Sequence, residues 1–259
     1  MSMQSVKGKI AWVTGAGTGI GRAGAVALGA AGATVILSGR RVPELEAAAK
    51  RINDAGGAAI VEQLDIADGD AVDAVVDRIT EKYGRLDILV NSAGLNRPNR
   101  RWKTMEREDW DIVIDVNLSG AFNCSLAALR VMRPQRDGLI INVSSMAGRR
   151  VGTVSGFAYA ASKHGVNAMS ESINIENCHL GIRACALCPG EVATEIMDKR
   201  PNPPSAEDRA RMIQEDDIGE TILFISQTPA NVCLNEVLIT PTWNRGYIGS
   251  AEHAIDRTE

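Results

Sequence analysis

The sequence contains few cysteines: five among 259 residues, at positions 124, 178, 185, 188 and 233. An odd number without an export signal favours free thiols over a disulfide framework. Cys185 and Cys188 have a spacing that can bind zinc, but they fall in an apolar stretch that we interpret as a strand. Residues three apart in a strand point to opposite faces, and no second pair or nearby histidine completes four ligands. We therefore expect no metal site.

Long hydrophobic runs and an excess of positive charge are also missing. The apolar runs are strand-sized, well short of the ~20 residues that a membrane-spanning helix needs. A formal net charge of -4 provides neither a nucleic-acid footprint nor a polybasic membrane surface. The first residues lack the apolar region of a signal peptide. We expect no nucleic-acid or membrane partner, and a cytoplasmic location.

Short apolar runs alternate with longer amphipathic stretches along the whole chain. This alternation predicts right-handed βαβ crossovers and one α/β domain over 1–259, a doubly wound parallel sheet with helices on both faces. Its core would span about 9–240, followed by a tail over 241–259. We predict strands near 9–14, 33–38, 58–64, 86–91, 139–144, 182–188 and 236–240, and helices up to about 31 and near 43–56, 69–83, 106–132, 157–179 and 206–226. Ser205 and Asp208 form a capping box at the start of the last helix.

A glycine-rich segment follows the first predicted strand. It reads Gly15-Ala16-Gly17-Thr18-Gly19-Ile20-Gly21, and an alanine-rich helix and the second strand come next. A strand, glycine turn, helix and strand within about 30 residues is the context in which such glycines indicate dinucleotide binding. The glycines permit a tight turn and aim the N–H groups of the helix N-terminus at a pyrophosphate. A glycine turn without a ligand is the alternative.

Tyr159 and Lys163 lie four residues apart in a predicted helix, and therefore on one face of it. A tyrosine pKa near 10 must fall by roughly 3 units, about 4 kcal/mol, for proton transfer at neutral pH. One cation at about 4 Å supplies on the order of 4 kcal/mol in a partly buried site. The pair predicts a general acid and base, although an isolated Tyr-x-x-x-Lys is common by chance.

These motifs together resemble the compact branch of the short-chain dehydrogenase/reductase family. Thr14-Gly15-x-x-x-Gly19-Ile20-Gly21, Ser145 and Tyr159-x-x-x-Lys163 carry the resemblance. Asn91-Ser92-Ala93-Gly94, Asn117, Pro189-Gly190-x-Val192-x-Thr194 and Asp65 are similar to further family elements, with serine replacing the second asparagine of the first. The resemblance implies a Rossmann-like sheet of about seven strands that binds a nicotinamide cofactor.

The resemblance also implies the reaction and its residues. The family transfers a hydride reversibly between the nicotinamide and a carbonyl or secondary alcohol of a small molecule. Tyr159 would be the acid or base, Ser145 would bind the reacting oxygen, Lys163 would hold the ribose and lower the Tyr159 pKa, and Asn117 would position a water near Lys163. The expected cofactor contacts are Gly15, Gly17, Thr18, Gly19, Ile20, Gly21, Ser38, Arg40, Arg41, Asp65, Ile66, Asn91, Ala93, Gly94, Tyr159, Lys163, Pro189, Gly190, Val192 and Thr194.

Two details depart from the family pattern. The segment from Ser145 to Tyr159 is one residue longer than usual, which makes the local geometry an open question. Ser144 is the alternative catalytic serine, but the family spacing favours Ser145. Thr18 stands where one NADP-binding pattern has arginine or lysine.

The end of the second strand bears on the choice of cofactor. It reads Ser38-Gly39-Arg40-Arg41, with glycine where NAD-preferring relatives carry an aspartate for the ribose 2′-hydroxyl. The two arginines can form charge-assisted bonds to a 2′-phosphate. A solvated loop is the alternative interpretation. We predict that NADP(H) is preferred over NAD(H).

The segments expected to line the substrate pocket, 95–103, 146–157 and 191–205, are rich in cations. They contain Arg97, Arg100, Arg101, Lys103, Arg149 and Arg150. These side chains would suit an anionic substrate such as a keto acid. Solvated loops and subunit contacts are the alternatives. The proline-rich stretch 201–204 is either a hinge of a substrate lid or a simple loop.

Two other functions stay open on this fold. A non-catalytic dinucleotide sensor or scaffold is possible because a fold alone never determines function. It would not need Ser145, Tyr159, Lys163 and Asn117 together. A sugar-nucleotide epimerase or dehydratase would usually have a longer C-terminal region and another glycine spacing. The family resemblance also implies a homotetramer or homodimer that pairs through the helices near 106–132 and 157–179.

Overall fold

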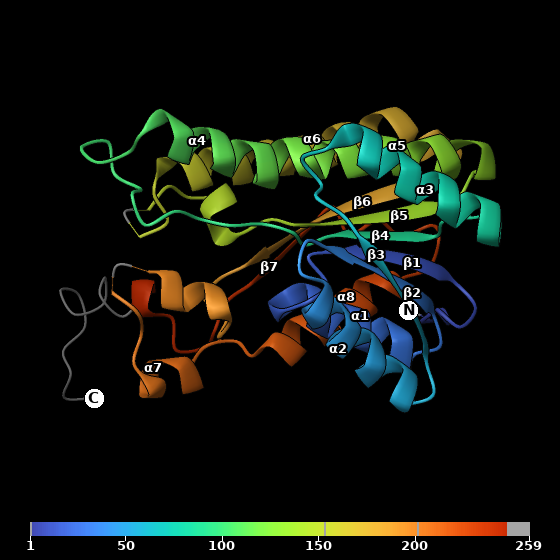
Figure 1. Cartoon of the computed structure of the whole chain (residues 1–259), viewed down its shortest axis with the longest axis horizontal. Coiled ribbons are helices and arrows are strands. Elements are labelled where there is room, and N and C mark those ends of the chain that lie inside the picture. Colours follow the sequence, from blue (N-terminus) through green and yellow to red (C-terminus); the bar gives the residue numbers. More distant parts are fainter. Residues whose placement is uncertain (1, 153, 201, 248–259) are drawn as a thin grey trace.

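Seven parallel strands form one sheet within residues 2–152, 154–200 and 202–247, the part of the chain that the computed structural model describes (Figure 1). The strand order is β3-β2-β1-β4-β5-β6-β7. The order reverses between β1 and β4, and a crevice opens at the carboxyl ends of strands at such a reversal. The strands are β1 (Ile10–Thr14), β2 (Thr34–Gly39), β3 (Ala58–Gln63), β4 (Ile88–Asn91), β5 (Gly138–Val143), β6 (Ile182–Pro189) and β7 (Glu236–Ile239).

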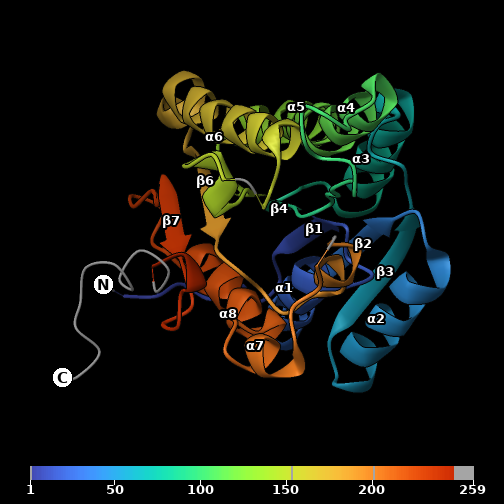
Figure 2. The same cartoon turned by 90° about the vertical axis from the view of Figure 1, so that its left-hand side faces the viewer.

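Helices cover both faces of this sheet, as predicted (Figure 2). On one face lie α1 (Gly19–Ala30), α2 (Val42–Asp54) and α8 (Glu215–Ser226). On the other lie α3 (Gly69–Tyr83), α4 (Arg107–Ile114), α5 (Gly120–Gln135) and α6 (Phe157–Asn177). A π turn at Asp115–Ser119, short 3₁₀ segments at Met146–Gly148, Cys178–Leu180 and Glu195–Lys199, and the short α7 (Ala206–Ala210) complete the described helices.

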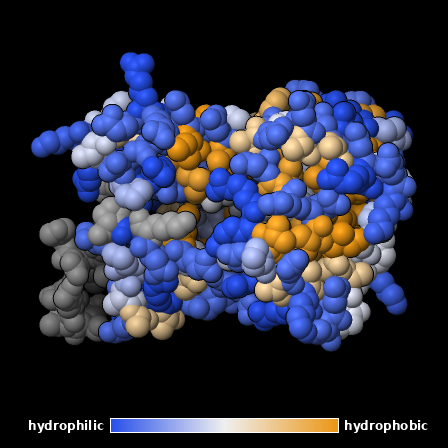
Figure 3. All heavy atoms as spheres, viewed as in Figure 1, coloured by the Kyte–Doolittle hydropathy of each residue, from blue (hydrophilic) through white to orange (hydrophobic). Residues whose placement is uncertain are grey.

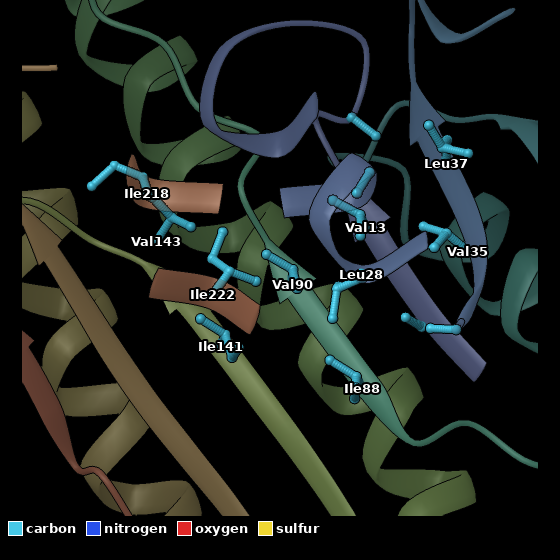
Figure 4. Packing of buried hydrophobic residues seen from close by; sticks show 14 of the residues in the cluster. Val13, Leu28, Val35, Leu37, Ile88, Val90, Ile141, Val143, Ile218 and Ile222 are labelled. Carbon is cyan, nitrogen blue, oxygen red and sulfur yellow. The ribbon is translucent and has the colours of Figure 1, made fainter. Parts of the chain in front are cut away.

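Each face of the sheet has its own hydrophobic core. Leu28 of α1 and Ile222 of α8 pack on strand residues such as Val90 (Figure 4). Trp12 lies in the opposite core, against α3 and α5, and is fully buried. A parallel sheet that is covered on both faces needs such continuous apolar strands. The residues of the edge strand β3 are only partly buried. Figure 3, which has the same view as Figure 1, shows hydrophobic residues at the surface in the region of this strand.

The cysteines of β6 follow the strand geometry. Cys185 belongs to the core beneath α1 and α8. The Cys188 sulfur lies 3.7 Å from Oδ1 of Asn167, a residue of α6 on the other face. The two thiols therefore point to opposite faces of the sheet, as predicted.

The helix predicted over 206–226 is wrong as a single element. Ser205 and Asp208 do form the predicted capping box, but α7 ends at Ala210 and α8 begins at Glu215. Between them, the Ile213 N–H donates to the Glu191 carbonyl at 3.1 Å, and its carbonyl accepts from the Ala193 N–H at 2.9 Å. This strand-like bridge to the segment after β6 takes the backbone groups that a continuous helix would use.

The helix predicted over 106–132 is interrupted by a π turn at Asp115–Ser119 and extends to Gln135. The stretch Arg107–Gln135 is long and apolar enough to cross a membrane, and half of its apolar window is buried in the protein. Its buried residues pack on α3 and the sheet, so that side of the stretch belongs to the core.

Candidate active site

The turn after β1 presents the N-terminus of α1 to the carboxyl edge of the sheet. Thr18 is the N-cap residue, and its side chain makes no capping hydrogen bond. The first turn of α1 contains no acidic residue. The N–H groups of this turn are therefore not capped by side chains, which is the arrangement that binds phosphate.

Glycine is required in this turn by close backbone contact. Gly15 has a φ of +65°, and a Cβ there would lie 2.7 Å from Cα of Ala93. A Cβ on Gly21 would lie 2.3 Å from the Gly15 carbonyl oxygen. The turn thus packs tightly on itself and on the loop after β4, and it leaves its outer surface to a ligand. The residues present fit a dinucleotide.

A cleft of about 1410 Å³ runs along the carboxyl edge of the sheet. Its nucleotide end is formed by residues of 15–20, 39–45 and 64–66. Its substrate end is formed by residues within 94–104, 144–152, 154–159, 190–200 and 244–246 and by Asn202, in loops and helix ends toward the left of Figure 1. The predicted residues that line the cleft are Gly15, Gly17, Thr18, Gly19, Ile20, Arg40, Arg41, Asp65, Ile66, Ala93, Gly94, Ser145, Tyr159, Lys163, Pro189, Gly190, Val192 and Thr194.

Four predicted residues lie behind that lining: Gly21, Ser38, Asn91 and Asn117. The Ser38 hydroxyl accepts a hydrogen bond from Nε1 of Trp12 at 2.9 Å, and the residue is fully buried. The Asn91 amide donates to Ser125 and Asn142 in the core. The Ser38 and Asn91 side chains hold neighbouring strands and helices together, and the cofactor contacts of these two residues stay a prediction.

Ser145, Tyr159 and Lys163 meet in the middle of the cleft. Burial raises the pKa of Tyr159, and a hydrogen bond from Ser145 and the positive charge of Arg200 oppose that rise. The Ser144 hydroxyl donates to the Lys163 carbonyl at 3.1 Å, whereas the Ser145 side chain is the one that hydrogen-bonds to Tyr159. The extra residue between Ser145 and Tyr159 does not separate them.

Lys163 lies beside Tyr159, and its ammonium donates a hydrogen bond to the backbone. Its ammonium nitrogen lies 5.6 Å from the Tyr159 ring centre and donates to the Val143 carbonyl at 2.8 Å. Burial lowers the pKa of Lys163 itself to about 8. The i, i+4 spacing placed both groups on one face of α6, but it could not reveal the carbonyl at the end of β5.

Asn117 lies in the π turn Asp115–Ser119. Such turns within helices are frequent at functional sites. The Asn117 Oδ1 accepts from the Leu95 N–H at 2.8 Å, and its Nδ2 donates to the Leu95 carbonyl at 2.9 Å. A Cβ on Gly94 would lie 3.3 Å from the Asn117 oxygen and 3.7 Å from the Lys163 nitrogen. Asn117 therefore fixes the loop after β4 directly beside Lys163.

Arg40 and Arg41 stand at the nucleotide end. Arg41 donates to the Thr18 hydroxyl at 3.1 Å and pairs with Glu44 at 2.9 Å. Arg40 lies 3.8 Å from Asp65. Both arginine side chains are more than half exposed to solvent, so either can turn toward an anion at the end of β2.

Three charged residues of the substrate end were not named as candidates from the sequence: Glu191, Arg200 and Arg245. Glu191 pairs with Arg200 at 2.6 Å and with Arg245 at 2.7 Å. Although burial raises it, hydrogen bonds from Arg245 and Arg200 hold the pKa of Glu191 below its ordinary value. The position of Glu191 directly after Pro189-Gly190 was the available signal; nothing in the sequence links it to Arg245 in the tail.

Comparison with known proteins identifies the family. The family model described as short chain dehydrogenase matches residues 9–204. The chain belongs to the short-chain dehydrogenase family. The resemblance seen in the sequence is confirmed, and this family member is an NAD(P)-dependent oxidoreductase that acts on CH–OH or C=O groups.

Its relatives act on different molecules. The chain is 38% identical over 206 residues to a 3beta-hydroxysteroid dehydrogenase of Mediterraneibacter gnavus, covering 80% of this chain and 72% of that one. It is 34% identical to the 3-oxoacyl-(acyl-carrier-protein) reductase FabG of Thermotoga maritima, over 90% and 96% of the two chains. A metagenomic short-chain oxidoreductase solved in complex with NADP has a TM-score of 0.80 and 33% identity, over 93% and 100%.

Proposed function

We propose that this short-chain dehydrogenase transfers a hydride between NADP(H) and a carbonyl or secondary alcohol of a small molecule. The observation that carries the proposal is the meeting of Ser145, Tyr159 and Lys163 in a cleft that also contains the uncapped N-terminus of α1. A non-catalytic sensor would need only the second feature. The metagenomic relative bound to NADP supports the choice of cofactor.

The nucleotide end would hold the cofactor through backbone and charge. The N–H groups at Thr18, Gly19 and Ile20 would bind the pyrophosphate. Arg40 and Arg41 would bind the 2′-phosphate, because Gly39 offers no carboxylate to repel it. Asp65 and Ile66, beyond β3, would border the adenine.

The substrate end would manage the proton. When bound, the nicotinamide supplies or accepts the hydride. Tyr159 gives its hydroxyl proton to the carbonyl oxygen in reduction and takes it back in oxidation. Ser145 donates a hydrogen bond to the same oxygen and stabilises the charge that develops there. Lys163 binds the ribose hydroxyls, and Asn117 holds the Leu95 backbone and a water beside it.

A homotetramer or homodimer is part of the proposal. Phe122 and Leu126 of α5 and Ile175 of α6 are about half exposed or more, on the outer helices of one face. Exposed apolar side chains of this size commonly mark protein contacts. Light scattering that gives the mass of one chain would contradict this part of the proposal.

The test of the function is oxidation of NADPH and NADH with a panel of ketones, diketones, quinones and keto acids. The proposal expects turnover of at least one class, with a higher kcat/KM for NADPH than for NADH. Tight NADPH binding without turnover of any panel member would favour the sensor. A preference for NADH would overturn the assignment of Arg40 and Arg41.

A further inference from the structure

The structure separates the cations of the substrate segments into two groups. Arg97 pairs with Asp109 and Arg149 pairs with Glu236, and neither lines the cleft. Arg100, Arg101 and Arg150 do line it, and the structure adds Arg200 and Arg245. Arg101 and Arg150 are exposed, but Arg100 is buried and the Arg200 side chain is mostly buried, so a solvated loop does not explain these last two residues.

Carboxylates do not balance the charge of the substrate end. Its described lining residues from position 95 onward include six cations: Arg100, Arg101, Arg150, Lys163, Arg200 and Arg245. The same lining contains two carboxylates, Glu191 and Glu195. Glu191 is shared between Arg200 and Arg245, and Arg245 also pairs with Asp208 at 3.4 Å. A protein with a formal net charge of -4 thus concentrates positive charge where the substrate binds.

Arg100 and Arg200 line the same cleft as Tyr159, and each is held in place. Arg100 is buried, and its guanidinium donates to the carbonyls of Arg97 and Val154 at 2.9 and 3.0 Å. Its backbone packs against Gly156, where a Cβ would lie 2.5 Å from the Arg100 carbonyl oxygen, just before α6 begins. The Arg200 side chain is 18% exposed and is held by Glu191.

The two guanidinium groups are also close enough to influence titration. Burial lowers the pKa of Arg100, and the positive charge of Arg200 lowers it further. The charge of Arg200 acts on Tyr159 as well. Because both arginines line the cleft that contains Tyr159, an anion held by them would relieve their mutual repulsion in the same cleft as the reacting oxygen.

Building on the proposed function, we propose that the substrate carries a carboxylate, bound by Arg200 and Arg100 next to the carbonyl that Tyr159 serves. The planar guanidinium of arginine suits a carboxylate because it donates two parallel hydrogen bonds. The phosphates of the cofactor do not explain these residues, since the cofactor groups that carry them face the nucleotide end in the proposed function. Glu191 orients Arg200 and would weaken anion binding by its own charge.

The experiment compares matched substrates rather than absolute rates. A series of 2-oxo, 3-oxo and 4-oxo carboxylates and their primary amides is reduced with NADPH, and the ratio of kcat/KM between each acid and its amide is measured. In the wild-type protein we expect the best acid to exceed its amide by about 10- to 100-fold, the range of one charge-assisted hydrogen bond. A variant whose fold is damaged lowers kcat/KM for the acid and for the amide alike, so the ratio between them stays the same.

Neutralising a positive residue and neutralising a negative residue of the site should change the acid-to-amide ratio in opposite directions. Arg200→Gln should lower the acid-to-amide ratio about tenfold or more, and Arg200→Lys should retain part of it. Glu191→Gln should raise the ratio, because it removes a negative charge beside the proposed carboxylate. Arg149→Gln is the matched control outside the cleft and should leave the ratio unchanged.

The outcomes distinguish this inference from the proposed function. If amides or neutral ketones are reduced as well as the acids, the carboxylate site is wrong and the oxidoreductase stands. If Arg200→Gln and Glu191→Gln shift the ratio in the same direction, the arginine acts through structure and the site is also wrong. If no carbonyl compound of any class is reduced with NADPH, the proposed function fails first.

Discussion

The two ends of the cleft are built from different kinds of contact. At the nucleotide end, backbone packs on backbone, as where a Cβ on Gly21 would lie 2.3 Å from the Gly15 oxygen. At the substrate end, long charged side chains hold the loops, as where Glu191 joins Arg200 of one loop to Arg245 of the tail. Backbone contact requires glycine at defined positions, whereas an ion pair can be made from many positions.

This difference explains why the nucleotide end of the cleft can be predicted from the sequence and the substrate end cannot. A glycine turn must keep its spacing to bind a pyrophosphate, so the motif is visible along the chain. A substrate loop can change its charged residues without changing the fold, and the function of the fold changes with them. The following predictions test this contrast, beginning with the largest expected effect.

Tyr159 should be essential for catalysis, although it lies at the substrate end of the cleft, where the loop residues can change without changing the fold. Tyr159→Phe should reduce kcat by about 10²- to 10⁴-fold, since the proton donor is lost. NADPH affinity, measured by fluorescence titration, should change little. Tyr83→Phe is the control: Tyr83 also has a lysine near its ring, at 5.4 Å against 5.6 Å for Tyr159, but it lies outside the cleft. Equal losses in both variants would contradict the assignment.

Gly39 should decide the cofactor preference at the nucleotide end. A Cβ there would lie 3.5 Å from Leu45, an ordinary contact, so a side chain fits. Gly39→Asp should shift the ratio of the NADPH and NADH dissociation constants toward NADH by about 100-fold, because a carboxylate repels the 2′-phosphate and binds the 2′-hydroxyl. Gly39→Ala adds the same Cβ without charge and should not reverse the preference. A reversal in the alanine variant would mean that shape, not charge, selects the cofactor.

Gly21 should be the costliest glycine to replace by alanine in the glycine turn. Gly21→Ala forces the turn apart and should lower the free energy of unfolding by about 1–3 kcal/mol, measured by urea denaturation. Gly69→Ala is the comparison, because its Cβ would lie 3.9 Å from the nearest side chain. We expect Gly69→Ala to leave stability unchanged or to raise it slightly. Equal effects at the two sites would contradict the backbone-packing account.

Lys163 should leave a small signature in the pH dependence of stability. Its pKa is about 8 in the folded protein and 10.5 ordinarily, so between these values the unfolded chain binds more protons. The free energy of unfolding therefore rises with pH in this window, by about 1 kcal/mol between pH 8 and 9 from this group. Below pH 8 the buried ammonium costs stability.

The difference between wild type and Lys163→Met isolates this effect. Buried thiols such as Cys124 titrate with the opposite sign above pH 9, but both proteins share that contribution. The wild-type curve should therefore rise relative to the variant from pH 8 to 9. A constant difference would show that Lys163 is not desolvated as its burial implies.

The strands and the fold class could be predicted because each depends on local pattern. Apolar runs between glycines indicated the strands, and the spacing of Tyr159 and Lys163 placed them on one helix face. The hydrogen bond from Lys163 to Val143 could not be predicted, since it depends on how α6 lies over β5. The break between α7 and α8 has the same cause, because Ile213 bonds to a segment distant in sequence.

The transfer of hydride from the nicotinamide to a carbonyl carbon at Tyr159 is the central claim. The most direct measurement uses NADPH deuterated at both C4 positions, with mass spectrometry of the alcohol formed from the best panel substrate. The account predicts one deuterium in the wild-type product and almost no product from Tyr159→Phe. A product without deuterium, or full labelling in Tyr159→Phe at the wild-type rate, would contradict it.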